Sequence, residues 1–227
     1  MEIHIKSMAD RKVFACFYTD EATNITYRRN TVLQFGDSWD VIGTAILLNP
    51  GSATIAADQL LDKELESLRN LTGIADGWQV VDFGRDATIR DWLPKIFNGY
   101  YAHKERELKG VILLYNLFNI KEPNSDKAKH IYAKVDSDYL YTSQSDIDLI
   151  NKSPIVYIGW GKGLSPELTE QAHRLFESLD KKVISHYNSV MDDNVFYHPR
   201  AIQLGYKRFE KVKEIIMSFE EALERDE

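Results

Sequence analysis

The feature that most constrains the fold of this chain is a series of short, almost purely apolar runs. They span residues 41–48, 110–115 and 155–158, and a shorter fourth run contains Val183 and Ile184. A strand that is buried on both faces of a sheet has this composition, because neither face meets water. We therefore interpret the runs as strands at the centre of a sheet.

Helical patterns separate these runs along the chain. They cover residues 56–71, 86–100, 126–135 and 165–179. Strands that alternate with helices imply right-handed crossovers and a parallel sheet. The last of these helices has the clearest start, because Ser165 supplies a capping hydroxyl and Pro166 suits the first helical position.

The two ends of the chain add an antiparallel element and a covering helix. Residues 12–18 and 26–35 are rich in β-branched and aromatic side chains, and the polar stretch 20–24 lies between them. This pattern predicts an antiparallel hairpin or meander within residues 1–38. Near the other end, one apolar stripe predicts a helix that covers the sheet. Its members are Phe209, Val212, Ile216, Phe219 and Leu223.

Together these elements predict a single α/β domain over residues 1–227. We expect residues 39–227 to form a three-layer αβα sandwich with a central, mainly parallel sheet, to which residues 1–38 add the N-terminal β-hairpin or meander. With 227 residues, of which 44% are hydrophobic, the chain can bury enough apolar surface to fold without disulfides.

Charge and composition count against several classes of protein. The formal net charge is −7, so the surface as a whole repels phosphate backbones, and a protein that coats DNA is disfavoured. No stretch reaches the roughly 18 consecutive apolar residues of a membrane span, so we expect a cytoplasmic protein with no membrane partner. The single cysteine, Cys16, excludes a disulfide within the chain.

Several catalytic chemistries also lack support in the sequence. There is no Gly-x-Ser-x-Gly elbow, and Cys16 falls inside a predicted strand, so a covalent hydrolase mechanism is disfavoured. The histidines form no His-x-x-x-His pair, and there is no Cys-x-x-Cys pair. We therefore expect neither a required metal nor a cofactor.

Polar side chains follow the predicted strands at the points where the strands end. Ligands of parallel sheets bind outside the carboxyl ends of the strands, because the loops converge there. We therefore expect a ligand site at Asn49, Asn116 and His198, which follow the first, second and fourth runs. The full set of candidate site residues is Asn49, Pro50, Gly51, Ser52, Asn116, Trp160, His198 and Arg200.

Each piece of this set also has a purely structural interpretation. Asn-Pro-Gly is a frequent turn sequence, and the segment 159–163 has neither dinucleotide-fingerprint nor phosphate-loop spacing, which favours a tight turn there. A single histidine is more often structural than catalytic. The convergence of these residues on one rim, and no single member, favours a ligand site.

A polar cluster lies near the start of the second predicted helix and has two interpretations of equal weight. It consists of Asp82, Arg85, Asp86, Thr88 and Arg90. The cluster either caps the helix and carries solvated charges, or forms a rim that contacts an anion. Under the second interpretation the anion-contacting residues are Arg85, Arg90 and Lys162.

The order of these motifs resembles an uncharacterised bacterial and phage family, a domain of unknown function. The shared segments are Leu47-Leu48-Asn49-Pro50, Asp86-x-Thr88, Asn116-Leu117-Phe118, Gly159-Trp160-Gly161 and His198-Pro199. The same order is more distantly similar to the uracil-DNA glycosylase superfamily, in which an Asn-Pro-Gly or related motif follows the first strand and a His-Pro motif follows the last. The resemblance covers most of the chain.

The glycosylase resemblance implies a role for each matched residue. Asn49 would orient the attacking water, Asn116 would read a base edge, and His198 would stabilise the departing base. Asn49 differs from an aspartate because it cannot accept a proton. The chain departs from the glycosylase pattern at Leu48, where those enzymes have glycine, and at Arg200, where they have a small serine-containing turn.

Two functional hypotheses follow from the sequence. The first is an enzyme that handles a nucleobase, nucleotide or nucleic acid and hydrolyses an N-glycosidic bond. The second is a non-catalytic domain of the same fold that binds a small ligand or a protein partner. A basic groove around His198, with Lys162, Arg200, Lys207 and Arg208, would favour nucleic acid, and an acidic or closed rim would favour a small ligand or protein.

Residues 57–84 are interpreted as a lid or an added helix over the site.

Overall fold

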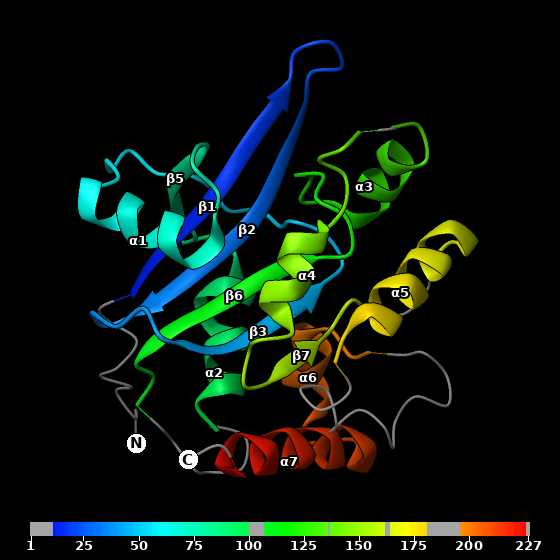
Figure 1. Cartoon of the computed structure of the whole chain (residues 1–227). Coiled ribbons are helices and arrows are strands. Elements are labelled where there is room, and N and C mark those ends of the chain that lie inside the picture. The colour runs from blue at the N-terminus through cyan, green and yellow to red at the C-terminus, as the bar shows by residue number, and fades with distance from the viewer. Residues whose placement is uncertain (1–10, 100–106, 136, 162–163, 181–195, 226–227) are drawn as a thin grey trace.

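The computed structural model describes residues 11–99, 107–135, 137–161, 164–180 and 196–225. It shows an α/β fold around one mixed, seven-stranded sheet, in the strand order β4-β5-β1-β2-β6-β3-β7 (Figure 1). The strands are β1 (Arg11–Asp20), β2 (Ile25–Phe35), β3 (Val41–Leu47), β4 (Thr54–Ile55), β5 (Trp78–Asp82), β6 (Gly110–Asn116) and β7 (Val156–Ile158).

The parallel part of the sheet consists of β6, β3 and β7, and its strands are the apolar runs at residues 41–48, 110–115 and 155–158. β3 lies between β6 and β7 and pairs in parallel with both. Every residue of β6 and β7 is buried, as the almost purely apolar composition predicts. The fourth predicted strand, at Val183 and Ile184, lies outside the described residues.

The antiparallel part of the sheet begins with the predicted hairpin of β1 and β2, which projects from the molecule (Figure 1). The expected mainly parallel sheet is corrected to a mixed one. β2 pairs antiparallel with β6, and β5 pairs antiparallel with both β1 and β4. The hairpin therefore forms part of the central sheet, because β2 pairs with the edge of β6 that β3 does not occupy.

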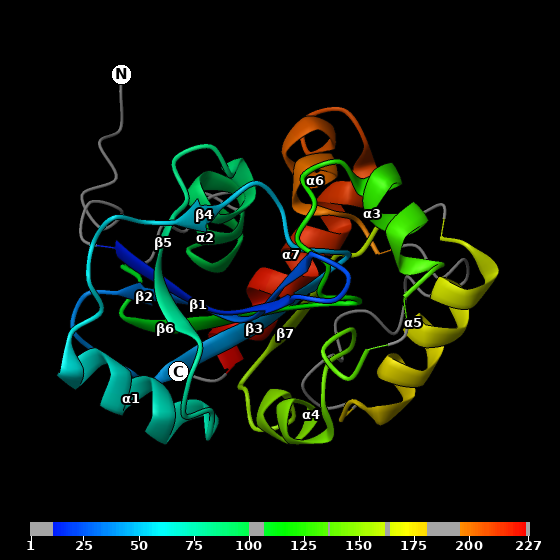
Figure 2. The same ribbon diagram turned by 90° about the horizontal axis from the view of Figure 1, so that it is seen from above.

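Helices lie on both faces of the sheet (Figure 2). α1 (Asp62–Thr72) and α4 (Gln144–Ile150) are on one face, and α2 (Leu93–Phe97) and α6 (Pro199–Gly205) are on the other. A π-helical turn at Thr88–Trp92 leads directly into α2. The remaining helices are α3 (Ser125–Tyr132), α5 (Pro166–Ser178) and α7 (Glu210–Arg225).

The helix predicted over residues 56–71 is shorter than expected. Its first part is extended, and the Ala56 amide donates to the Val80 carbonyl oxygen at 2.9 Å. The helix begins at Asp62, after Leu61, whose backbone is extended. The interpretation of residues 57–84 as a lid is also corrected, because they form α1 and β5 and none of them lines the cavity described below.

The other helix predictions agree with the structure apart from their ends. The helix expected over 86–100 is observed as the π-helical turn and α2, and the one expected over 126–135 ends earlier, at Tyr132. α5 begins after Ser165, whose hydroxyl accepts from the Leu168 amide. The predicted covering helix is α7, on which Val212, Ile216, Phe219 and Leu223 are buried, and the Phe219 ring lies 5.6 Å from the Tyr157 ring of β7. Phe209 is corrected, because it precedes the helix and is 61% exposed. Within the described part of the chain, no helix is long and apolar enough to cross a membrane.

Candidate functional site

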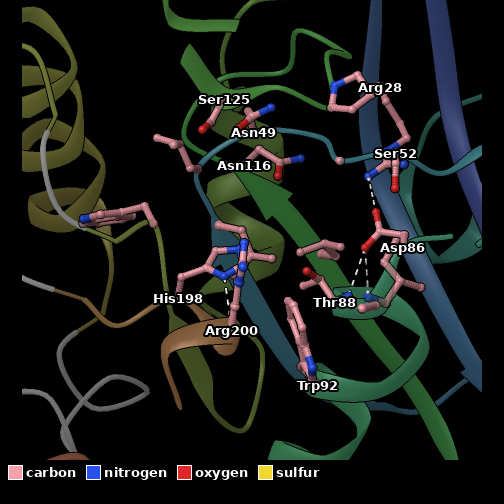
Figure 3. Close-up of a pocket in the computed structure, with 18 of the residues that line it drawn as sticks. Arg28, Asn49, Ser52, Asp86, Thr88, Trp92, Asn116, Ser125, His198 and Arg200 are labelled. Carbon is pink, nitrogen blue, oxygen red and sulfur yellow. Dashed lines mark hydrogen bonds and ion pairs between the residues drawn. The ribbon is translucent and has the colours of Figure 1, made fainter. Parts of the chain in front are cut away.

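A cavity of about 520 Å³ lies at the carboxyl ends of β3 and β6 (Figure 3). It collects side chains from segments that are far apart in the sequence. Of the predicted site residues, Asn49, Gly51, Ser52, Asn116, Trp160, His198, Arg200 and Arg85 line it. It is also lined by residues that sequence reasoning did not assign to the site, among them Arg28, Asp86, Thr88, Trp92, Ser125 and Lys129.

Three predicted residues do not line this cavity or cannot be placed. Pro50 is buried beside Asn49 but is not part of the cavity wall. Arg90 is not in the wall either, because its guanidinium bonds to the Asp91 carboxylate and the Gly84 carbonyl oxygen. Lys162 lies outside the described residues.

Asn49 follows β3 and presents only an acceptor to the cavity. Its Nδ2 atom donates to the carbonyl oxygens of Pro50 and Glu122, both at 2.9 Å. A side-chain amide nitrogen has two hydrogens, so both donors are used and the Oδ1 atom remains as an acceptor. The contact with Glu122 also joins the loop after β3 to the loop after β6, which holds both loops at the cavity.

Asp86 is a buried carboxylate with one oxygen held in place and one open. The Oδ1 atom accepts from the Thr88 and Ile89 amides, at 3.1 and 3.3 Å, which caps the π-helical turn. The Oδ2 atom has no hydrogen bond from the described residues, and its only ion-pair contact is with Arg28 at 4.0 Å. Asp86 therefore fits the capping interpretation of the polar cluster, and it also lines the cavity.

Gly51 makes room for this carboxylate. A Cβ atom at Gly51 would lie 2.5 Å from the Asp86 Oδ2 atom, which is closer than real Cβ atoms approach. Any larger residue at position 51 would therefore force the Asp86 carboxylate to move. This close approach places the open carboxylate oxygen beside the Asn49 segment.

Arg28 comes from the middle of β2 and reaches the cavity from the antiparallel part of the sheet. Its side chain is only 2% exposed, yet its Nε atom has no hydrogen-bond partner among the described residues. The other contacts are long, with the Ala53 carbonyl oxygen at 3.4 Å and the Asp86 carboxylate at 4.0 Å. Burial lowers the pKa of Arg28 to about 10, against the opposing effect of Asp86, so it remains a cation at neutral pH.

Two further buried donors in the cavity wall have no partner among the described residues. They are the Nδ2 atom of Asn116, at the end of β6, and the Nε1 atom of Trp160, after β7. A buried donor without a partner costs about 1–3 kcal/mol. A ligand whose acceptors reached these atoms would remove this cost.

His198 stands immediately before α6 with its ring against the cavity (Figure 3). Its Nδ1 atom accepts from the Arg200 amide at 3.1 Å, so in the neutral ring the hydrogen is on Nε2. Burial lowers the pKa of His198 to about 4, partly offset by the attraction of Asp86. At neutral pH the residue is therefore an uncharged donor, and the edge-on Trp92 ring, 6.3 Å away, helps to hold it.

Sequence reasoning found the residues at strand ends and missed those that depend on tertiary packing. Arg28 carried a weak signal in the sequence, because it is a charged residue on a face of β2 whose other side chains are uncharged. Trp92, Ser125 and Lys129 carried none. Among the described residues, no group of three or more His, Cys, Asp or Glu side chains is arranged to hold a metal ion.

Comparisons of the chain with protein-family models, curated proteins and solved structures found no match.

Proposed function

We propose that the cavity binds a nucleobase with its attached sugar and hydrolyses the N-glycosidic bond between them. One observation carries the proposal: an open carboxylate oxygen, on Asp86, and a neutral imidazole donor, on His198, line the same cavity. Glycosidic hydrolysis needs both functions, because positive charge develops on the sugar while negative charge develops on the base.

His198 serves the departing base. When the bond between the sugar carbon and the base nitrogen breaks, its electron pair leaves with the base. The Nε2 hydrogen of His198 stabilises the resulting negative charge by donating a hydrogen bond. A neutral imidazole suits this role, because it donates without first taking up a proton from the solvent.

Asn49 and Asp86 serve the attacking water. The Oδ1 atom of Asn49 accepts one hydrogen of the water and orients it, since both amide hydrogens are already used. As the water oxygen bonds to the sugar carbon, the Oδ2 atom of Asp86 accepts the proton that the water loses. Asp86 thereby supplies the proton acceptor that Asn49 cannot be.

The unpartnered donors serve base recognition. The Nδ2 atom of Asn116 donates to a carbonyl oxygen or ring nitrogen of the base, and Arg28 and Trp160 donate to neighbouring acceptors. Because these donors are buried, a base that lacks matching acceptors leaves them unpaired and binds more weakly.

We also propose that the fold is a variant of the three-layer αβα sandwich of the uracil-DNA glycosylases. Two features support this: helices lie on both faces of the sheet, and the Asn-Pro-Gly and His-Pro segments meet at one cavity. The long antiparallel hairpin within the sheet would be the distinguishing feature of this variant.

The test is release of free base, followed by chromatography, from nucleosides, nucleotides and oligonucleotides that carry normal, deaminated or damaged bases. We expect wild-type protein to release base from at least one of them and Asn49→Ala, Asp86→Asn and His198→Ala each to be strongly impaired. Matched controls are Asn70→Ala, Asp148→Asn and His173→Ala, which change exposed residues outside the cavity wall. No release from any substrate by the wild-type protein would refute the proposal.

A second candidate is a non-catalytic domain that binds a ligand in the same cavity. It is favoured by the structural contacts of the proposed catalytic residues, since Asn49 bridges two loops and Asp86 caps a helix. Tight binding of a base-containing ligand that is recovered intact after long incubation would favour this candidate.

A further inference from the structure

We infer that the ligand of this cavity is a free mononucleotide, with the base inside and the phosphate at the mouth, and not a nucleic acid. This inference rests on the proposed function, because it concerns the substrate class of the same site. It starts from the charge of the cavity wall, which is opposite in sign to that of the whole chain.

The cavity wall is cationic in an acidic protein. Of the described residues, four with cationic side chains line it, Arg28, Arg85, Lys129 and Arg200, against the single carboxylate of Asp86. The chain as a whole has a formal charge of −7. An anion is therefore attracted to the cavity and repelled by most of the remaining surface.

The positive charge is divided between the inside and the mouth. Arg28 is buried and lies near Asp86, so much of its charge is balanced inside the cavity. Arg85 and Arg200 are exposed and come from two separate segments, one before the π-helical turn and one in α6. A phosphate at the mouth can contact these arginines and remain partly hydrated, while the uncharged base enters.

The inner wall suits a ligand with several acceptors. The Nε atom of Arg28, the Nδ2 atom of Asn116 and the Nε1 atom of Trp160 are buried donors without partners among the described residues. A nucleobase offers carbonyl oxygens and ring nitrogens to such donors. A volume of about 520 Å³ is in the range of roughly 300–1,000 Å³ that encloses small organic ligands.

The surroundings of the cavity disfavour a polymer. A single strand is normally bound along a basic groove that follows its backbone. Here the segment that forms one side of the cavity alternates in sign, because Glu122 and Asp126 interrupt Lys121, Lys127 and Lys129, so it offers no unbroken run of basic side chains. Lys207 and Arg208, which could extend a basic groove from His198, are exposed but do not line the cavity.

The experiment compares binding of nucleoside 5′-monophosphates, the matching nucleosides and short oligonucleotides of the same bases, by titration calorimetry. We expect one monophosphate to bind at least about tenfold more tightly than its nucleoside, which is the size of one charge-assisted hydrogen bond. Arg200→Gln should remove most of this difference and leave nucleoside binding unchanged. Arg208→Gln is the matched control and should preserve the difference.

The outcomes separate this inference from the proposed function. A monophosphate that binds by these criteria but releases no base supports the inference and contradicts the hydrolysis. Base release from oligonucleotides without binding of any monophosphate supports the hydrolysis and overturns the inference. Equal affinity for nucleoside and monophosphate, or no binding of either, also overturns it. Since Arg200 is exposed, Arg200→Gln is expected to fold.

Discussion

Two neighbouring arginines on β2 reach buried carboxylates in opposite surroundings. Arg29 contacts Asp146 of α4 at 3.1 Å, and Asp146 also accepts hydrogen bonds from Asn30 and Ser143. Arg28 lies 4.0 Å from Asp86, whose second oxygen has no hydrogen bond from the described residues. Successive side chains of a strand point to opposite faces, so each arginine serves a different side of the sheet.

The difference separates a structural ion pair from a candidate functional one. Asp146 is 3% exposed and its carboxylate accepts four hydrogen bonds, so both of its oxygens have partners. Asp86 is similarly buried, at 6% exposed, but one of its oxygens faces a cavity. Burial alone therefore does not distinguish the two carboxylates, whereas incomplete hydrogen bonding does.

The largest expected effect is on catalysis, at the pair of Arg28 and Asp86, in which one carboxylate oxygen has no hydrogen bond. Asp86→Asn should slow base release by about 10³-fold, the size typical of a lost general base. The amide oxygen can still accept from the Thr88 and Ile89 amides, but the buried Arg28 loses its ionic partner, so the free energy of unfolding should fall by about 2 kcal/mol. Single-turnover base release and urea denaturation measure the two quantities. An unchanged rate would mean that both carboxylates are structural.

The next largest effect is on the stability of the protein, at the pair of Arg29 and Asp146. Asp146→Ala should lower the free energy of unfolding by about 3 kcal/mol, because Arg29 and Asn30 lose a buried partner. Urea denaturation measures this loss, and the exposed Asp148→Ala is the control. A loss smaller than that of Asp86→Asn would reverse the comparison between the two pairs.

The third prediction concerns the pH dependence of stability that the titration of His198 causes. The folded-state pKa of His198 is lowered to about 4 by burial, so unfolded protein binds a proton at His198 more readily than folded protein. Stability should therefore fall by about 2–3 kcal/mol as the pH drops from about 6.5 to about 4. Urea denaturation across this range should show a shallower loss for His198→Gln.

Asp86 and Asp146 should differ in their effect on this titration. Asp86 raises the pKa of His198, so Asp86→Asn should lower it further. Asp146→Asn should leave it unchanged. The His198 ring signal followed by NMR from pH 7 downwards tests both, and a shift of equal size in the two variants would refute the assignment of Asp86 to the cavity.

The smallest effects concern the helix caps beside the two carboxylates. Ser143→Ala removes a hydroxyl that caps α4 and donates to Asp146, and should cost about 1 kcal/mol. Thr88→Ala should cost less than about 0.5 kcal/mol, because Asp86 is bonded to the Thr88 backbone amide and not to its hydroxyl. Thermal denaturation measures the loss of stability in both variants, and equal losses would contradict the prediction that Ser143→Ala costs more than Thr88→Ala.

The arrangement of Asn49, Asn116, Trp160 and His198 around one cavity could be anticipated from the sequence. Apolar runs indicate buried strands, and residues that follow parallel strands meet at one edge of the sheet. The structure brings these four residues together, and the strand ends of the argument are observed for Asn49, Asn116 and Trp160, whereas the strand predicted before His198 lies outside the described residues. Whether they act on a ligand is the subject of the proposed experiments.

Other features could not be read from local pattern. The start of α1 at Asp62 was predicted six residues too early, because residues 56–61 are compatible with a helix until Ala56 pairs with β5. The pairing of β2 with β6 was missed for a related reason, since a strand sequence does not state its neighbour.

By itself the sequence determined the α/β class, the hairpin, the buried strands and the positions of the polar strand ends, since these depend on periodicity and on residues close in the chain. Only the tertiary structure decided that Arg28 and Asp86 share the cavity and that Arg29 and Asp146 form a closed cluster. The physical reason is that hydrogen-bond satisfaction and burial depend on contacts between distant segments. Two adjacent arginines therefore look alike in the sequence and differ in the folded protein.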